Sequence, residues 1–275
     1  MRIVDTYNEI QAAFLQKEWS LSRWREYADS ISTSVREKVE DDAKDYDFAS
    51  QVAPVIQSAL SNRSKLEETH ESFLLATQQL NDRFFNVFQC EVEVDIVLYL
   101  GLCNGAGWAT SIDGRMTVLL GMEKIIELDW CDARSMASLL YHEVTHIWHD
   151  AVRNECLNID RQSDKSIWQL YREGVAMYGE QLLCNDLSYY HQDDGEWLSW
   201  CIKNKDALFQ EYRRRVEENE STQDFFGDWC TYQGHSDVGY YLGCEFIKHL
   251  LPKYSLTEIA KLTIDALTKE WSDYE

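Results

Sequence analysis

The chain contains few of the residues that interrupt helices, with 2 proline and 12 glycine residues among its 275. This scarcity disfavours an all-β protein, whose many turns use both residue types, and it favours helices. Apolar residues make up 45% of the chain and aromatic residues 13%, which is typical of a globular protein. We therefore expect a mostly helical α+β chain that buries a sizeable core.

Positive charge is also scarce. The 26 Lys and Arg residues are outnumbered by 48 Asp and Glu residues, and the formal net charge is −22. Such a chain is repelled by polyanions, so we expect no nucleic-acid partner and no binding to anionic membranes. Two explanations of the acidity stay open: solubility conferred by solvated helix faces, or a preference for cationic substrates.

Long apolar runs are missing as well. The segment Met1–Asp5 lacks the apolar core of a signal peptide, and no stretch approaches the roughly 20 apolar residues that span a bilayer. The eight cysteines show no short paired spacing, so we expect thiols packed as small apolar groups rather than disulfides or zinc ligands. These features together predict a cytoplasmic protein with no membrane partner.

One motif carries recognisable chemistry, His142-Glu143-x-x-His146. On a helix, positions i and i+4 lie about 40° apart around the axis, so both imidazoles can reach one metal ion. Glu143 lies at the flank of that face, where a general base would contact a water held by the metal. An N-cap at Asp132 and apolar residues at helical spacing predict a helix over 133–153.

A catalytic zinc needs a third protein ligand. A third histidine six residues after the motif is excluded, because Val152 stands there. The remaining option is a glutamate on a following helix, predicted over 164–184, and Glu173 is the candidate. Gly174 beside it has no side chain, so a neighbouring helix or the metal can approach closely. The sequence therefore predicts zinc held by His142, His146 and Glu173.

At these residues the chain resembles the gluzincins, zinc peptidases with His-Glu-x-x-His on one helix and the glutamate ligand on the next. The stretches 172–176 and 238–243 are similar to a poorly characterised family of predicted zinc-dependent proteases. The resemblance covers about residues 92–252. It implies a zincin-type fold, in which a small twisted sheet lies above the metal helix and the lower part is helical.

The resemblance also implies further site residues. It makes Tyr240 the donor that stabilises the oxyanion of amide hydrolysis, with Tyr241 and His235 as alternatives; packing is the other interpretation of Tyr240. Glu180 is a candidate for orienting a ligating imidazole, although the family's usual position for that role holds Met177 here.

The chain divides into three predicted parts: 1–90, 91–190 and 191–275. The first is expected to be helical throughout, either as a platform for the catalytic part or as a separate partner-binding or substrate-covering module. Alternating apolar residues and the Asp113-Gly114 turn predict three or four strands over 91–127, mostly antiparallel. In zincins an edge strand binds the substrate backbone, and residues 105–110 are the candidate here; a plain turn is the alternative.

Three functions remain open. The leading hypothesis is zinc-dependent peptide hydrolysis with Glu143 as general base, acting on a peptide or protein substrate. The second is a zincin-shaped binding or scaffold protein with little or no turnover. The third is a helical interaction protein that binds no metal.

Two further residues bear on the leading hypothesis. The stretch Gly121-Met122-Glu123 partly resembles the amine-binding loop of aminopeptidases, which leaves exo- and endopeptidase activity both open. His149 follows the motif on the same helix face. It is either an outer contact of the site or a histidine satisfied by its neighbours.

Overall fold

The computed structural model describes residues 1–15, 17–153 and 159–274. The chain is mostly helical, as its composition predicts, and it forms two compact units, Met1–Ile147 and Trp148–Glu275. The three-part division at residues 90 and 190 stays a prediction. Among the described residues, no helix combines the length and the apolar character needed to cross a membrane, and none of the described cysteines is in a disulfide.

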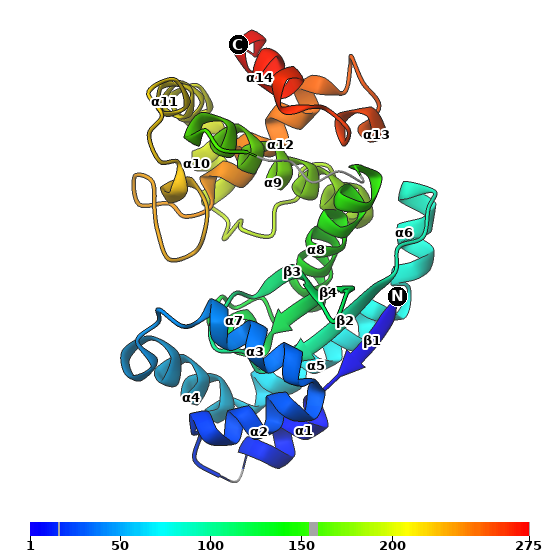
Figure 1. The fold of residues 1–275 in the computed structure, drawn as a ribbon, viewed down its shortest axis with the longest axis vertical. Helices are drawn as coiled ribbons and strands as arrows, with labels where there is room; N and C mark the ends of the chain where they lie inside the picture. Colours follow the sequence, from blue (N-terminus) through cyan, green and yellow to red (C-terminus); the bar gives the residue numbers. More distant parts are fainter. Residues whose placement is uncertain (16, 154–158, 275) are drawn as a thin grey trace. The chain divides into compact units, whose positions relative to one another are not determined.

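The first unit combines a small sheet with helices and ends within the helix that carries the His-Glu-x-x-His motif (Figure 1). Its elements are β1 (Arg2–Asp5), α1 (Tyr7–Phe14), α2 (Leu21–Ile31), α3 (Thr33–Asp42), a π-helical turn (Phe48–Val52), α4 (Ala53–Ser61), α5 (Arg63–Gln78), α6 (Leu80–Phe88), β2 (Val94–Tyr99), β3 (Gly107–Ile112), β4 (Arg115–Gly121), α7 (Met122–Glu127) and the first part of α8 (Ala133–Arg153).

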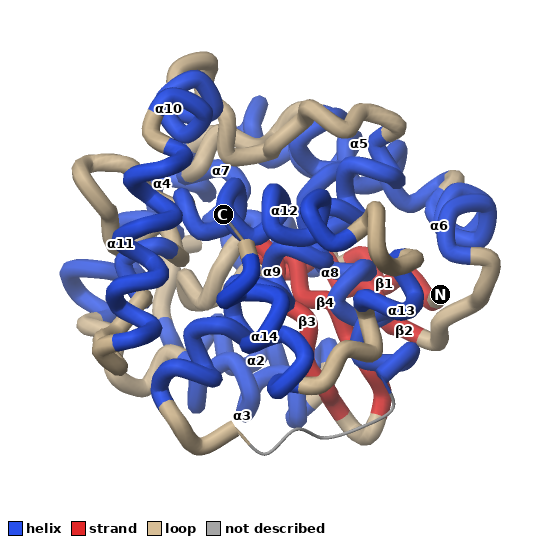
Figure 2. The backbone as a smooth tube through the Cα atoms, turned by 90° about the horizontal axis from the view of Figure 1, so that it is seen from above, coloured by secondary structure: helices blue, strands red, loops and turns tan. Residues whose placement is uncertain are grey.

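The sheet is mixed, with the strand order β1-β2-β4-β3 (Figure 2). β2 runs parallel to both β1 and β4, and only the β3–β4 pair is antiparallel. The prediction of a mostly antiparallel sheet is therefore wrong. The hairpin at Asp113-Gly114 is confirmed: both residues have positive φ, which suits the two-residue turns that join twisted antiparallel strands. This hairpin leaves β3 at the edge of the sheet.

The prediction that residues 1–90 are helical throughout is wrong at Arg2–Asp5, which forms β1. Four residues are too few to show a periodic pattern, and the partner strand lies about ninety residues further along the chain. A buried carboxylate, Asp95 on β2, anchors the strand. Arg2 on β1 and Arg115 on β4 both form ion pairs with it, the latter at 3.0 Å.

The N-terminal helices are bonded to the end of β2, in the same unit as the sheet. The indole N–H of Trp24 on α2 donates to the carbonyl of Leu100 at 2.8 Å, and the N–H of Leu100 donates to the Tyr27 hydroxyl at 3.0 Å. The Thr6 hydroxyl donates to the carbonyl of Leu98 at 2.8 Å. Because these polar groups are buried, each needs such a partner. These bonds hold the N-terminal segment and its helices against the end of β2.

The second unit is helical. After the last residues of α8 come α9 (Gln162–Cys184), α10 (Trp197–Lys203), α11 (Lys205–Glu217), a 3-10 turn (Gln223–Phe225), α12 (Val238–Leu250), α13 (Leu256–Ile259) and α14 (Ile264–Asp273). The helices predicted at 133–153 and 164–184 are confirmed as α8 and α9. The sequence also predicts a short polar loop over 154–163, and its residues 154–158 lie outside the described residues.

Two helices of this unit are shorter than the apolar pattern predicts. Apolar residues at helical spacing predict one helix over 197–212, but α10 ends and α11 begins around Asn204. The sequence also predicts a capping box at Ser255 and Glu258 that begins a helix to about Lys269. The capping box is present, but the helix it begins ends at Ile259. Apolar periodicity continued across both breaks, so periodicity alone did not reveal them.

A closely packed helix pair, α9 and α12, forms the centre of the second unit. The two backbones meet at Gly174 and Gly243. A Cβ on Gly174 would lie 3.0 Å from the Gly243 Cα and would overlap its carbonyl group, and a Cβ on Gly243 would overlap the Leu170 carbonyl oxygen. The close approach expected at Gly174 is therefore made by a neighbouring helix.

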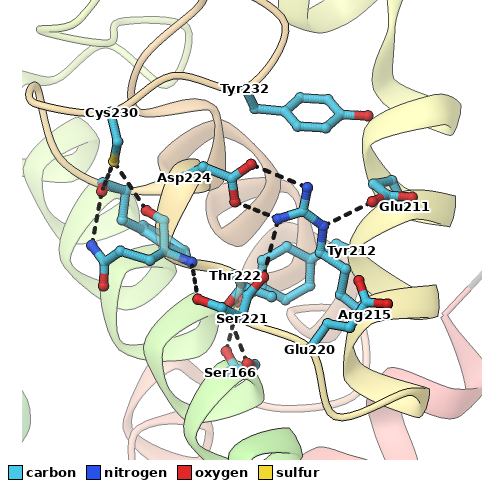
Figure 3. Close-up of polar contacts among 12 residues, drawn as sticks. Ser166, Glu211, Tyr212, Arg215, Glu220, Ser221, Thr222, Asp224, Cys230 and Tyr232 are labelled. Atoms are coloured by element: carbon cyan, nitrogen blue, oxygen red, sulfur yellow. Dashed lines mark hydrogen bonds and ion pairs between the residues drawn. The ribbon is translucent and has the colours of Figure 1, made fainter.

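A polar network fastens the segment before α12 to α9 and α11 (Figure 3). The Arg215 guanidinium on α11 bonds to the carboxylates of Asp224 and Glu211. The Thr222 hydroxyl donates to the Ser166 hydroxyl on α9 at 3.0 Å, and the Tyr212 hydroxyl donates to the Ser166 carbonyl at 2.8 Å. These bonds hold residues 222–224, in the connection between α11 and α12, against α9 and α11.

The Gly174–Gly243 crossing generates a stability prediction. We expect Gly174→Ala to lower the free energy of unfolding by about 1–3 kcal/mol, because the added methyl group must push α12 away. Lys165→Ala, at an exposed position of the same helix, is the control and should change the free energy by less than about 0.5 kcal/mol. Urea unfolding followed by circular dichroism measures both. Equal stability of the two variants would contradict the close crossing.

Candidate metal centre

α8 carries the motif residues His142, Glu143 and His146, and all three are buried, with 4%, 6% and 5% of their surfaces exposed. The helix begins as predicted: the Asp132 carboxylate accepts the N–H groups of Arg134 and Ser135, at 2.9 and 3.1 Å. The two imidazole rings are one turn apart, with centroids 4.8 Å from each other and planes nearly perpendicular. Both rings can therefore be directed at one ion.

Glu143 lies against the start of the edge strand. A Cβ on Gly107, the first residue of β3, would come within 2.9 Å of the Glu143 Cγ and 3.1 Å of its Oε1, and within 3.0 Å of Leu139. Only glycine fits there without moving the carboxylate. The sequence offers residues 105–110 as the substrate-binding strand because glycine allows another backbone to approach. That approach stays a prediction, and the group found close to Gly107 is the side chain of Glu143.

Among the described residues, two groups of side chains have ligand atoms within 4.8 Å of one another and could hold a metal ion: His142, His146 and Glu173, and His142, Glu180 and His191. The first group is the set predicted from the sequence. Its two imidazole nitrogens and one carboxylate are the ligands of a catalytic zinc site, and three protein ligands leave a fourth position open. The donor chemistry of these residues therefore fits Zn²⁺.

The second group is less suited to a metal because two of its members already bind each other. The His191 Nδ1 lies 3.0 and 2.9 Å from the two oxygens of Glu180, and both side chains are buried. The other ring nitrogen, Nε2, lies 3.0 Å from the side-chain nitrogen of Gln192. An ion held by His191 would therefore have to displace one of these partners. Glu180 was a sequence candidate for orienting an imidazole, and the imidazole that it holds is that of His191.

His191 was missed by sequence reasoning. It follows α9 in an irregular segment, and nothing in its spacing connects it with Glu180, eleven residues earlier. Only the return of the chain after α9 brings the two together. A lone histidine outside any periodic pattern offers no signal by which this pairing could have been found.

The candidates for oxyanion stabilisation lie in and before α12. Tyr240 is half-buried in the first turn of α12, with its ring edge-on to Phe226 at 5.7 Å. Tyr241 is buried beside Tyr190, and His235 stacks on Trp200 with centroids 4.0 Å apart. The packing of Tyr241 and His235 favours structural roles for both, and the role of Tyr240 stays a prediction.

His149 is bonded to α9 through one of its ring nitrogens. It is fully buried, and its Nε2 lies 3.0 Å from the Tyr171 hydroxyl. That hydroxyl donates its proton to the Ile259 carbonyl at 2.7 Å, so the His149 Nε2 must donate to the Tyr171 oxygen. The histidine thereby helps to fasten the end of α8 to α9 and to the segment after α13.

Glu123, which resembled an amine-binding residue, is fully buried in α7. Its two carboxylate oxygens accept the N–H groups of Gly101 and Cys103, at 2.7 and 3.1 Å. Burial raises the pKa of this carboxyl group to about 7. The side chain therefore holds the turn between β2 and β3, which lies just before the edge strand, and these bonds engage both of its oxygens.

This raised pKa predicts a pH dependence of stability. Between about pH 4.5 and 7 the folded chain keeps a proton on Glu123 that the unfolded chain has released, so its contribution to stability falls as the pH rises. As the pH rises through this window, we expect the free energy of unfolding of wild type to fall relative to that of Glu123→Gln. The fall should be at most about 1.4 kcal/mol per pH unit. Urea unfolding at pH 5, 6, 7 and 8 measures the difference. A difference that did not change with pH would exclude the shifted pKa.

No family model matches the chain, and neither a curated protein nor a solved structure matches it.

Proposed function

We propose that the protein is a zinc-dependent peptidase in which His142, His146 and Glu173 hold the ion and Glu143 is the general base. The observation that carries this proposal is the grouping of the three ligand side chains, together with the position of Glu143 against the edge strand. The gluzincin-like order of these residues in the chain supports it as well. The zincin-like fold is part of the same proposal.

When bound, zinc acts as a Lewis acid that lowers the pKa of a coordinated water toward about 7 and takes up part of the developing negative charge. Glu143 accepts a proton from the attacking water and passes it to the nitrogen of the leaving amine. Its position on α8, directly after the proposed ligand His142, would leave it beside a bound ion without making it a ligand.

The substrate backbone is proposed to pair with β3. This strand is at the edge of the sheet, and its residues 107–110 are half-exposed. An extended peptide added to this edge would form main-chain hydrogen bonds with β3. Because β3 begins beside Glu143, those bonds would carry the scissile bond toward the base. Tyr240 is proposed to donate a hydrogen bond to the oxyanion. The position of the cleaved bond relative to the peptide ends stays open.

The role of Glu143 is tested by Glu143→Gln. The amide keeps the shape of the side chain and cannot accept the proton, so we expect hydrolysis to fall by at least about 100-fold. Zinc content should stay at one ion per chain, measured by plasma mass spectrometry. Glu93→Gln, at an exposed position, is the matched control and should cleave a peptide library as wild type does. Undiminished cleavage by Glu143→Gln would show that the base is wrongly assigned.

The ligand set is tested by Glu173→Ala and His146→Ala. Each variant should lose zinc, because two ligands rarely hold the ion against competing chelators. We expect a chelator to lower the melting temperature of wild type and to leave that of both variants unchanged, since only a chain that binds metal is stabilised by it. A wild-type protein without zinc, with a melting temperature indifferent to chelators, would instead support the metal-free interaction protein.

The binding or scaffold alternative is separated from the peptidase by the same library digest. Wild-type protein with bound zinc and no cleavage, with or without chelator, would support a protein that keeps the site and lacks turnover.

A further inference from the structure

The second unit has an opening that takes no part in the proposed chemistry. It has a volume of about 410 Å³, within the range of roughly 300–1,000 Å³ of small-molecule sites. One wall is a single face of α12, where Tyr241, Glu245 and Lys248 follow at helical spacing. The other walls come from α10, the first residue of α11 and the segment after α9. Because Lys205 and Lys248 are its two cationic groups, we call it the Lys205–Lys248 opening.

The sides of this opening are apolar and exposed. Leu187 and Ile202 line it, and 52% and 59% of their surfaces are exposed, which places them among the most exposed large apolar side chains of the described residues. The buried rings of Tyr190 and Tyr241 line it as well. Water surrounds the two exposed aliphatic side chains. An apolar group that covered these side chains would release that water. The opening therefore favours a ligand with a hydrocarbon part.

The polar part of the opening has an excess of positive charge. Glu245 is shared by two ammonium groups, Lys205 at 2.8 Å and Lys248 at 3.3 Å, so the three groups together carry one net positive charge. This is the opposite sign from that of the chain, whose formal net charge is −22. A ligand with one negative charge would balance the three groups.

Both lysines are held in place at the opening. The Lys248 ammonium donates to the Leu187 carbonyl at 3.1 Å and to the Tyr190 hydroxyl at 3.5 Å. The Lys205 and Lys248 side chains stay 39% and 29% exposed. A bound carboxylate would contact Lys205 directly and would replace one of the three acceptors of the Lys248 ammonium. Two ammonium groups held beside an apolar surface suit a ligand whose acid group is attached directly to a hydrocarbon chain.

We propose that the Lys205–Lys248 opening binds an apolar monocarboxylate, with its hydrocarbon against Leu187 and Ile202 and its carboxylate on the two lysines. A medium-chain fatty acid and the C-terminal residue of a peptide with an apolar side chain share this chemistry. The site lies within the second unit and needs neither zinc nor turnover, so its test is independent of the proposed hydrolysis.

The test is calorimetric titration of the full chain with decanoate and with decanamide, its uncharged counterpart. We expect decanoate to bind and decanamide to bind at least about tenfold more weakly, because a charge-assisted contact to lysine is lost. N-acetyl-dileucine and its C-terminal amide form the second pair of probes. Binding of the free acid of either pair supports the site and identifies the source, whereas no binding of either acid overturns it.

The variants locate the binding. Lys205→Met and Lys248→Met should each raise the dissociation constant of the acid about tenfold, and Lys261→Met, at an exposed position outside the opening, should leave it unchanged. Ile202→Asn should also weaken binding; because this side chain is largely exposed, the variant should fold. Leu75→Asn, on α5 in the first unit, is its matched control. Equal affinities across all five variants would show that the acid binds elsewhere and would overturn the proposal.

Discussion

Removal of His142, Glu143 and His146 from water is the constraint on which the structure of the candidate site depends. His142 and His146 lie on one face of α8, with Glu143 at its flank. All three are at most 6% exposed, and burial of such groups is costly unless charges and hydrogen bonds compensate. Under the proposed function, a bound divalent ion would supply that compensation for the two imidazoles. Two glycines also allow close packing around these helices. Gly107 of β3 lies beside Glu143 of α8, and Gly174 of α9 lies against α12.

The topology of the sheet determines which strand begins beside the candidate base. β2 is covered on both sides by parallel partners, β1 and β4, and the hairpin places β3 outside them. The edge strand is then the one that starts next to Glu143. An antiparallel meander of β2, β3 and β4 would have put β3 in the middle, with its backbone groups fully paired. The mixed order is thus what gives the proposed peptide site a free edge within the sheet.

The acidic residues of the chain do not all have the same role. Several carboxylates have defined structural roles: Asp95 joins three strands, Glu123 holds the turn before β3, and Glu245 binds two lysines. The last arrangement reverses the local sign of charge beside exposed aliphatic side chains. The net charge of −22 therefore says little about the ligands of any one site, which depend on the few groups that line it.

Much of the candidate site was predictable because it is local in sequence. The His-Glu-x-x-His spacing, the Asp132 cap and the apolar pattern around them all lie within about twenty residues, and they specified α8 closely. Less local features were missed. β1 pairs with a strand about ninety residues away, His191 meets Glu180 only through the return of the chain after α9, and the breaks between α10 and α11 and between α13 and α14 lie within continuous apolar patterns.

The sequence by itself therefore determined the mostly helical character, the two helices of the candidate metal centre and the hairpin, because periodicity, caps and turn residues act over a few neighbouring positions. Tertiary structure alone decided the strand order, the edge position of β3 beside Glu143, the burial of Glu123 and the pairing of lysines around Glu245. These features depend on contacts between distant segments, whose free energy no local pattern records.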